Sequence, residues 1–299
     1  MTAHMKIGYP CANRSIGCSP SRTFDLRVFS RDHLILTIAE NLSCIARILE
    51  FNRKAGLYFF VIGPGLIPYA THPANTLIWA EEFAADFAAV GAFIRDAGMR
   101  IAVQPSYGFA VPEGKGEREA AHAATILDAM ELGTDAKVIA WAGGGPGRES
   151  AQDRTFKWLN RLPDGIRRRI AIRNDDTLSV ADCCAVAEEC GVPVVYDHLH
   201  RDSAPSPFSS AEAIRRCAAT WHEGDGAPIL VFATPEADGR PAHTIDADLF
   251  AEVLAASMPA DPDIVIDFQD REQSALIAMI AAFDDPRLIP GKELRKRGA

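Results

Sequence analysis

An aspartate and two histidines within four consecutive positions carry the clearest chemical signal in the sequence. Asp197, His198 and His200 directly follow the apolar run VPVVY. A carboxylate and an imidazole in a D-x-x-H pattern just beyond a strand are a common way to hold a divalent metal. Polar side chains at the ends of buried strands are costly unless they serve a site. The segment therefore predicts a metal-binding or ligand-binding site.

Further polar or aromatic residues follow other apolar runs along the chain. They are Tyr9 and Asn13, His72, Gln104 and Tyr107, Trp141 with the glycines at 143–145, the run Arg173-Asn174-Asp175-Asp176, Thr234 after Val231, and Asp267 with Gln269. Side chains at the carboxyl ends of parallel strands meet at one end of a barrel. We therefore expect Arg173, Asp197, His200 and Asp267 to share one pocket.

The elements that must position these residues are short apolar runs alternating with stretches of helical period. Eight runs have strand character: residues 6–9, 57–63, 100–106, 136–144, 168–175, 192–197, 227–234 and 263–270. Between them lie amphipathic stretches such as residues 34–56, which ends on a glycine of the kind that closes helices. Nearly continuous apolar strands imply a parallel sheet that is buried on both faces.

Eight such units predict an α/β fold, a single closed (β/α)8 TIM barrel over residues 5–285. Residues 286–299 are expected to form a basic C-terminal tail, because they contain the sequence GKELRKRG. No G-x-G-x-x-G motif follows the first strand, which argues against an open dinucleotide-binding sheet.

Composition narrows the class of protein further. The formal net charge of -9 disfavours nucleic-acid binding through bulk positive charge and leaves only a local basic rim for that role. The seven scattered cysteines do not form a disulfide scaffold or a structural zinc motif. The chain begins without an apolar signal core, and it lacks a run of eighteen apolar residues. We expect a reduced, soluble, cytoplasmic protein that does not enter membranes.

Several of these segments resemble the UV damage endonucleases, barrels related to the apurinic-site endonuclease and xylose isomerase superfamily. The resemblance covers about residues 6–285, and its strongest pieces are IGYPCANRS at 7–15, the block 41–73 that ends in LIPYATHP, IAIRNDD at 170–176, VPVVYDHLHR at 192–201 and VIDFQDREQSAL at 265–276. It implies a DNA-repair nuclease that cleaves the backbone of damaged double-stranded DNA beside UV photoproducts. It also implies a cluster of divalent metals, Mn or Zn, which polarise the phosphate and generate hydroxide.

The same resemblance implies roles for individual residues. His72, Asp197 and His200 stand at metal-ligand positions, and Asp267 stands where the family has Glu. His243 is a further candidate ligand, with Asp246 as the alternative at that position. Expected DNA contacts are Tyr9, Asn13, Gln104 and Tyr107, although an Asn after a strand is also ordinary turn chemistry and Tyr107 can simply cover the barrel mouth.

Other positions depart from the family pattern. The family's His-Pro-Gly-Gln reads Gln104-Pro105-Ser106-Tyr107, Trp141 replaces a ligand His, Arg173 replaces a bridging Glu, and Ile229 and Val231 replace Lys-x-His. Two unit charges ~4 Å apart repel by ~4 kcal/mol at an effective dielectric constant of ~20, so Arg173 opposes a metal at this point. The guanidinium can instead satisfy Asp197 and Asp267 by bidentate hydrogen bonds.

The sequence therefore predicts a partly degraded metal site, with Trp141, Arg173 and Val231 as pocket residues and fewer metals or none. Three hypotheses stay open at this point. The first is a UV damage endonuclease with weak or lost activity. The second is a non-catalytic barrel that binds DNA or a small anionic ligand through Arg173. The third is an isomerase-like or oxygenase-like enzyme that holds a single metal through Asp197, His200, Asp267 and one neighbouring residue.

Overall fold

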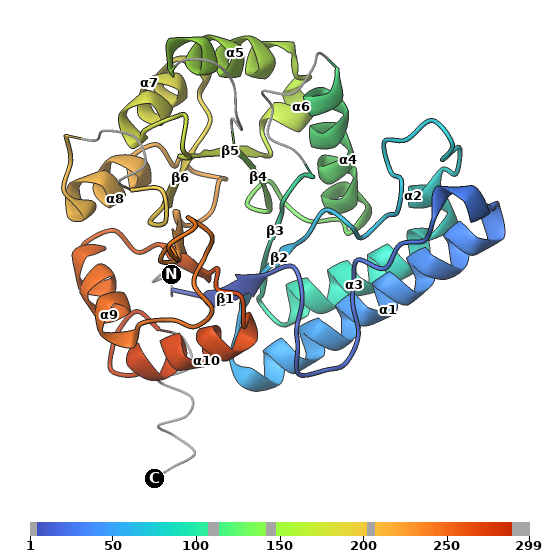
Figure 1. Cartoon of the computed structure of the whole chain (residues 1–299), viewed down its shortest axis with the longest axis horizontal. Coiled ribbons are helices and arrows are strands. Elements are labelled where there is room, and N and C mark those ends of the chain that lie inside the picture. The colour runs from blue at the N-terminus through green and yellow to red at the C-terminus, as the bar shows by residue number, and fades with distance from the viewer. Residues whose placement is uncertain (1–4, 107–113, 142–147, 202–206, 289–299) are drawn as a thin grey trace.

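The computed structural model describes residues 5–106, 114–141, 148–201 and 207–288. Eight parallel strands pair in sequence order, and β8 pairs with β1 to close a barrel (Figure 1). Helices follow the strands and surround them. The predicted (β/α)8 barrel is confirmed.

Each strand falls within or overlaps one of the predicted apolar runs. The strands are β1 (Ile7–Pro10), β2 (Phe59–Ile62), β3 (Arg100–Val103), β4 (Lys137–Trp141), β5 (Ile170–Arg173), β6 (Val194–Asp197), β7 (Ile229–Phe232) and β8 (Asp263–Ile266). Most are shorter than the runs predicted, because only the central residues of each run pair with the neighbouring strands.

The helices cover the outside of the barrel. They are the 3-10 helix η1 (Leu26–Val28), followed by α1 (Arg31–Ala55), α2 (Trp79–Glu82), α3 (Ala84–Asp96), α4 (Lys115–Ala129), α5 (Arg148–Arg161), α6 (Asp164–Arg167), α7 (Val180–Cys190), α8 (Ser210–Ala218), α9 (Ala247–Ala256) and α10 (Glu272–Ala281). The long helix α1 begins at a Ser30 cap and ends at Gly56 in the left-handed conformation, as the terminal glycine predicts.

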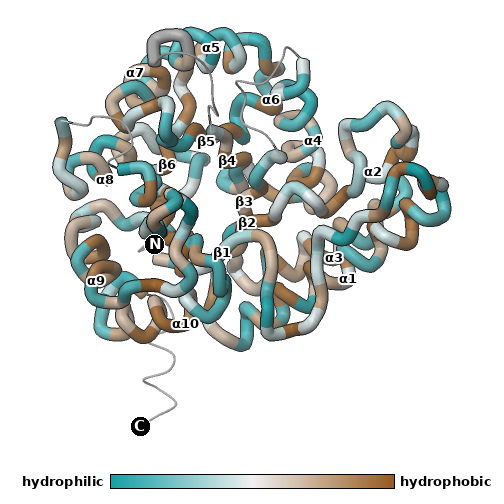
Figure 2. Tube along the Cα trace, viewed as in Figure 1, coloured by the Kyte–Doolittle hydropathy of each residue, from teal (hydrophilic) through white to brown (hydrophobic). Residues whose placement is uncertain are grey.

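Side chains alternate between the two faces of each strand, and the core accordingly divides into two layers. One set packs outward against the helices, in which hydrophobic and hydrophilic residues alternate along the chain (Figure 2). The other set fills the barrel interior and consists of Phe59, Val61, Ala102, Ile139, Ala171, Val195, Ile229, Val231 and Val265. The barrel is thus a packed core with two polar ends rather than a channel.

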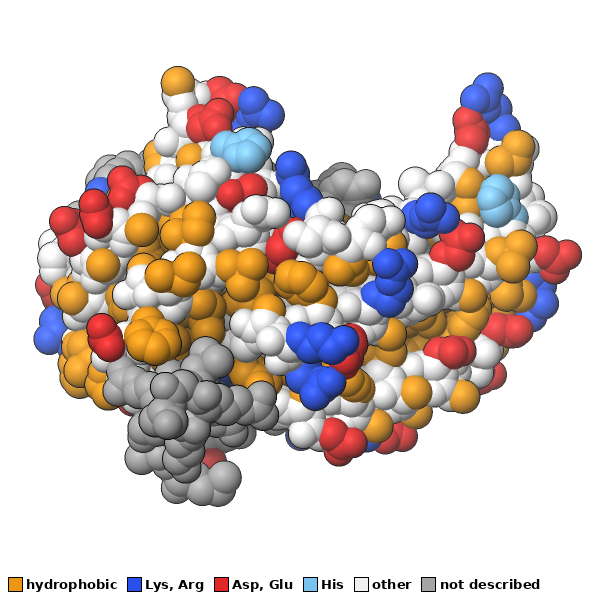
Figure 3. All heavy atoms as spheres, turned by 90° about the horizontal axis from the view of Figure 1, so that it is seen from below, with side chains coloured by type: hydrophobic (Ala, Val, Ile, Leu, Met, Phe, Trp, Pro, Cys, Tyr) orange, Lys and Arg blue, Asp and Glu red, His pale blue; other side chains and the backbone are white. Residues whose placement is uncertain are grey.

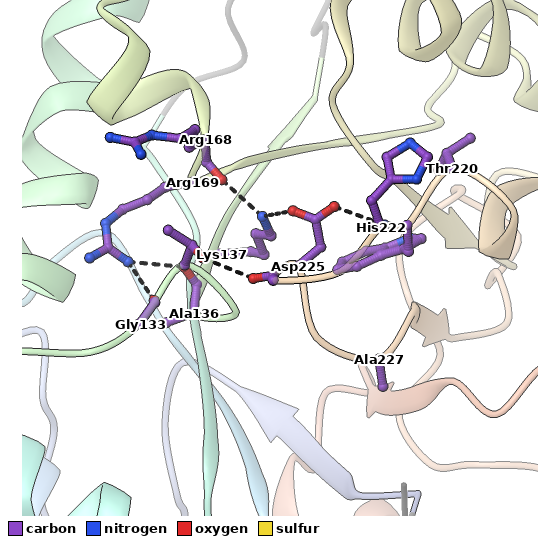
Figure 4. A network of polar contacts seen from close by, with 12 residues as sticks. Gly133, Ala136, Lys137, Arg168, Arg169, Thr220, His222, Asp225 and Ala227 are labelled. Atoms are coloured by element: carbon purple, nitrogen blue, oxygen red, sulfur yellow. Dashed lines mark hydrogen bonds and ion pairs between the residues drawn. The ribbon is translucent and has the colours of Figure 1, made fainter.

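The N-terminal end of the barrel is closed by buried charges. Arg100, Lys137 and Asp263 are the first residues of their strands, and each is at most 4% exposed. Arg100 Nη1 lies 2.7 Å from Asp263 Oδ2, and Lys137 Nζ lies 2.6 Å from Asp225 Oδ1. Lys137 also donates to the Arg168 carbonyl, so its ammonium is held between two acceptors (Figure 4).

One expectation needs adjustment. Cys18 and Cys44 form a disulfide that joins the loop after β1 to α1, so the expectation that the cysteines are all reduced is wrong for this pair. Beyond residue 285, Met5 N donates to Arg287 O at 2.8 Å and Met5 pairs with Leu288, so the first and last described residues lie side by side. Residues 289–299 of the predicted tail lie outside the described residues. Among the described helices, none combines the length and apolarity needed to cross a membrane.

Candidate functional site at the C-terminal barrel mouth

The alternation of side chains explains which residues meet at the mouth. Trp141, Arg173, Asp197 and Asp267 each lie two positions beyond an interior apolar residue. They therefore point inward one layer above the apolar core, at the carboxyl ends of the strands, where barrel sites are built. Arg173 Nε lies 3.4 Å from Asp197 Oδ2, and Asp267 is close enough to raise the pKa of Asp197.

Asp197 is the most buried charged group of this cluster, with a side chain that is only 2% exposed. Burial is the main cause that raises its carboxyl pKa, and Asp267 adds to the effect, whereas Arg173 and His200 oppose it. Leu199 N donates to Asp197 Oδ1 at 2.9 Å. The Asn174 side chain holds the Asp197 backbone through two hydrogen bonds, from Asp197 N at 2.7 Å and to Asp197 O at 3.0 Å. Asp197 is therefore fixed in place, but its neighbours only partly offset the cost of burying its negative charge.

Arg173 reaches over the indole of Trp141, with its guanidinium carbon 5.6 Å from the ring centroid. The Arg173 side chain is 13% exposed, and its buried Nε makes no hydrogen bond with the described residues. The contact with Asp197 is thus an ion pair at 3.4 Å without hydrogen-bond geometry. The expected bidentate clasp on Asp197 and Asp267 is not formed, and the cation retains donor capacity at the mouth.

Asp267 is paired with a different arginine, which the sequence analysis did not single out. Arg271 Nη1 donates to Asp267 Oδ1 at 2.9 Å. Arg271 has a φ of 59°, a left-handed backbone conformation that costs energy for a residue with a side chain. Its position within the motif VIDFQDREQSAL was the only sequence signal, and it did not predict the pairing.

Cys11 is a second residue of the mouth that sequence reasoning missed. It follows β1 with a φ of 70°, and its N donates to Val61 O at 2.8 Å. Burial raises the pKa of the Cys11 thiol to about 11, although Arg271 and Arg173 lower it in part. A side chain at Gly63 would come within 3.1 Å of Cys11 Sγ, so this glycine leaves room for the thiol.

His200 lies beside the cluster and pairs more closely with Asp176 than with Asp197. Its Nδ1 lies 2.8 Å from Asp176 Oδ1, whereas its Nε2 is 4.0 Å from Asp197 Oδ2. Asp197 and His200 of the D-x-x-H segment are therefore neighbours at the mouth, with His200 hydrogen-bonded to Asp176 rather than to Asp197. A neighbouring cavity of about 660 Å³ is lined by Asp176, His198, His200, Thr234, Arg240 and other residues of the loops after β5, β6 and β7.

The other predicted metal ligands lie on surface loops. His72 is exposed, and its Nδ1 accepts a hydrogen bond from Ala74 N at 3.1 Å. His243 is exposed and contacts Thr244 Oγ1 through Nδ1 at 3.1 Å. Asp246, the alternative to His243, caps α9 by accepting from Asp248 N and Leu249 N. Over the described ranges, no group of three or more His, Cys, Asp or Glu side chains is placed to hold a metal.

The donor set therefore does not fit a cluster of divalent metals. Each carboxylate that the sequence assigned to the metals has a guanidinium beside it, Arg173 for Asp197 and Arg271 for Asp267. A fixed positive charge at this distance opposes a cation and supplies none of the lone pairs that a metal needs.

The expected DNA contacts have different placements. Tyr9 is fully buried on the outward face of β1, where its hydroxyl donates to Asn52 Oδ1 at 2.7 Å. Asn13 is 2% exposed, donates to Tyr9 Oη and holds the following turn through Ser15 N. Both side chains are occupied in the fold and offer no surface to a base in this structure. Gln104 is partly exposed beyond β3, and Tyr107 lies outside the described residues.

Val231, the third predicted pocket residue, is 3% exposed in the barrel interior, and it is the register partner of Asp197 on the neighbouring strand. Seen from the side, the molecule is hollowed between two raised parts, one on the side of α1 and α2 and the other on the side of α8 and α9 (Figure 3).

Together, the fold and the site define a closed (β/α)8 barrel whose ionisable residues gather at the C-terminal mouth. The chain belongs to the UV-endonuclease UvdE family, whose model matches residues 5–290. The resemblance found in the sequence is thereby confirmed.

Individual relatives agree with this assignment. The UV DNA damage endonuclease of Clostridium perfringens (strain 13 / Type A) is 26% identical over 285 residues, which cover 91% of this chain and 69% of the relative. A crystal structure of SacUVDE is 28% identical with a TM-score of 0.85 and covers 98% of this chain and 100% of its own. Endonuclease IV from Thermus thermophilus matches with a TM-score of 0.54 at 14% identity over 85% of this chain and 95% of its own, a likeness of fold alone.

Proposed function

We propose that the protein is a DNA-repair barrel that binds DNA carrying UV damage and in which metal-dependent incision is weak or lost. Family membership and the similarity to UV DNA damage endonucleases support the DNA-repair part of the proposal. The pairing of the mouth carboxylates with arginines supports the loss of incision.

The single observation that carries the proposal is the position of Arg173. Its guanidinium occupies the mouth next to Asp197 at 3.4 Å and stacks on Trp141. Hydrolysis of a phosphodiester needs an activated water and charge neutralisation on the phosphate, which metal clusters supply together. An arginine neutralises charge but does not generate hydroxide. Binding of a phosphate can therefore persist where cleavage does not.

A second candidate function rests on the unused donor capacity of the same side chain. Arg173 Nε is buried without a hydrogen bond from any described acceptor. A phosphate or another small anion that reaches the mouth would satisfy this cation better than Asp197 does, because bidentate contacts to oxyanions suit a guanidinium. In that case the barrel binds a small anionic ligand rather than damaged DNA.

Incision of a UV-irradiated duplex in the presence of Mn²⁺, with and without a chelator, tests the proposal. We expect binding of the irradiated duplex with little chelator-sensitive cutting. Preference for irradiated over intact duplex separates the DNA function from the small-anion function. Equal, weak binding to both duplexes contradicts the DNA proposal, and robust chelator-sensitive cutting contradicts the loss of incision.

A pair of substitutions tests the metal argument directly. The double variant Arg173→Glu/Val231→His removes the opposing cation and adds a carboxylate and an imidazole that point inward at adjacent levels of the barrel. We expect it to retain more Mn²⁺ than the unmodified protein. Arg216→Glu, which makes the same charge change on the surface of α8, serves as the control and should retain no additional metal.

A further inference from the structure

A groove on the rim of the barrel is formed by parts of the chain that the mouth does not use. Two adjoining cavities of about 470 and 750 Å³ lie between the loop after β2, residues 63–78, and α4. Both are lined by Ala70, Thr71, His72, Pro73, Arg118 and His122. We call this combined space the His72–Arg118 groove.

The groove is held in shape by a buried carboxylate. Glu119 of α4 is 4% exposed, and its Oε1 accepts from Thr71 Oγ1 at 2.7 Å. Its Oε2 accepts from Ser106 N at 3.2 Å. The loop after β2, the loop after β3 and α4 are therefore tied together at one residue. Both Glu119 oxygens are used inside the protein, which limits the negative charge that they present to a ligand.

Two donors face the groove from its surface. His72 Nδ1 accepts a hydrogen bond from Ala74 N at 3.1 Å, which leaves Nε2 as the ring nitrogen that can donate. Arg118 is exposed, and its guanidinium has no ion pair or hydrogen bond within the part of the chain that the structure describes. Lys115 adds a second cationic side chain to the lining.

A third polar atom belongs to His122, which lines both cavities. His122 Nε2 is buried and has no hydrogen-bond partner among the described residues. The ring stands edge-on to Trp79, with centroids 5.3 Å apart. Burial lowers the pKa of His122 to about 4, so the ring is neutral at physiological pH. An orphaned polar atom on a groove wall is costly unless a ligand or water completes it.

The remaining wall is apolar and includes Ile78, Trp79 and Ala121. The groove thus combines a cationic edge, directed donors and an apolar side in a chain whose net charge is -9. A ligand that satisfies all three features carries an oxyanion joined to a flat, partly apolar group. Nucleotides have this composition, because a phosphate is linked through a sugar to a base.

We propose that the His72–Arg118 groove is a phosphate-binding site for a nucleotide unit, with Arg118 and His72 on the phosphate and His122 on the attached base or sugar. The site goes beyond the proposed function of the mouth, because it uses no residue of the Arg173 cluster. The nucleotide unit can belong to a nucleic-acid strand that crosses the rim or to a free nucleotide, and these two sources share the same chemistry.

Binding measured against salt concentration tests the proposal. The probes are a fluorescent single-stranded oligodeoxynucleotide and, separately, dAMP, and the variants are Arg118→Ala and His122→Phe. Arg53→Ala is the matched control, because it also removes one surface arginine and leaves Glu50 paired with Lys54 at 3.1 Å. We expect Arg118→Ala to weaken binding about threefold or more. It should also reduce the slope of the logarithm of the binding constant against the logarithm of salt concentration by about one, the value for one phosphate contact. Arg53→Ala should bind as the unmodified protein does.

His122→Phe keeps a ring against Trp79 and removes the orphaned nitrogen. It should weaken binding without changing the salt slope, because the neutral ring makes no charge contact. If the substitutions weaken binding of the oligonucleotide but not of dAMP, the site binds a nucleic-acid strand. If they weaken binding of dAMP but not of the oligonucleotide, the site binds a free nucleotide. Equal binding by Arg118→Ala and Arg53→Ala overturns the proposal, as does unchanged binding by His122→Phe. Thermal unfolding of each variant verifies that it is folded.

Discussion

The two ends of the barrel contain similar charged residues in different states of pairing. At the N-terminal end, Arg100 lies 2.7 Å from Asp263 and Lys137 lies 2.6 Å from Asp225. At the C-terminal mouth, Asp197 lies 3.4 Å from Arg173 and 4.0 Å from His200. The pairs at the first end are short, whereas the contacts of Asp197 at the mouth are long, although Asp267 there accepts from Arg271 at 2.9 Å. Arginine and aspartate side chains thus form tight ion pairs at the N-terminal end, whereas Arg173 keeps hydrogen-bond donors available at the mouth.

Additional partners account for the difference. Asp263 Oδ1 also accepts from Lys6 N at 2.7 Å, and Lys137 Nζ donates to Arg168 O at 2.9 Å. These buried charges are satisfied by backbone groups as well as by each other, which offsets the cost of removing them from water. The Nε atoms of Arg100 and Arg173 both lack an acceptor among the described residues, but Arg100 also donates through its Nη atoms to the Ala227 and Asp225 carbonyls, and Arg173 has no such backbone acceptor there. The mouth therefore remains able to bind an incoming group.

The largest effect is expected at the closed end. Asp263→Asn keeps the side-chain shape but leaves Arg100 buried without its counter-charge, so we expect a loss of about 3–5 kcal/mol in the free energy of unfolding. Denaturant unfolding measures this loss. Asp261→Asn nearby is the control, because Asp261 is exposed and its contact with Arg287 is 4.0 Å. A loss under about 1 kcal/mol for Asp263→Asn would show that the base is not more tightly paired than the mouth.

A smaller effect is expected for the arginine at the mouth. Arg173→Met removes a cation whose ion pair with Asp197 lacks hydrogen-bond geometry, and its apolar stem still packs on Trp141. We expect a loss of about 1 kcal/mol or less, because Asp197 can take up a proton when its partner is removed. The same denaturant experiment measures it. A loss as large as that of Asp263→Asn would remove the distinction between the two ends.

Asp197 gives the mouth a characteristic dependence on pH. Its pKa is raised in the folded protein, so its contribution to stability is fully present below the pKa of the unfolded chain and is lost as pH rises through the folded pKa. Asp197→Asn removes this loss. We expect the variant to gain stability relative to the unmodified protein as pH rises from about 4 towards neutrality. Unfolding measured across that range gives the slope, and an opposite slope would mean that Arg173 dominates over burial.

The smallest effect concerns the thiol at the mouth. Because the pKa of Cys11 is raised to about 11, only about one in a thousand Cys11 side chains is a thiolate at about pH 8. Iodoacetamide should therefore label Cys11 slowly, and peptide mass spectrometry after short exposure measures the rate. Cys184 is the internal comparison, because hydrogen bonding to Cys217 lowers its pKa. Faster labelling of Cys11 than of Cys184 would contradict the buried environment of the mouth.

The fold and the inward-facing residues of the mouth could be predicted because both follow from local patterns. Period-two alternation places Arg173, Asp197 and Asp267 above the apolar interior, and the same rule, applied to β1, turns Tyr9 outward into the helix layer. The strand pattern therefore predicts the buried position of Tyr9, whereas a DNA contact by Tyr9 is implied by the family resemblance alone.

The rest of the site depends on loops and on long-range placement. Cys11 and Arg271 reach the mouth through left-handed backbone conformations that residues other than glycine rarely adopt. His72 and His243 lie in long loops whose path a single sequence does not specify. The disulfide of Cys18 with Cys44 likewise requires the loop after β1 to pack on α1. These contacts arise from tertiary structure rather than from local pattern.

The most direct test of the arginine-paired mouth is the number of metals that the unmodified protein binds. The protein is equilibrated with Mn²⁺ or Zn²⁺, freed of loosely bound ions and analysed by inductively coupled plasma mass spectrometry. Pairing of Asp197 with Arg173 and of Asp267 with Arg271 predicts no tightly bound metal at the mouth. One metal per chain, lost in Asp197→Asn, would favour a single-metal enzyme. Two or three metals per chain, lost in the same variant, would contradict the replacement of the metal cluster by ion pairs.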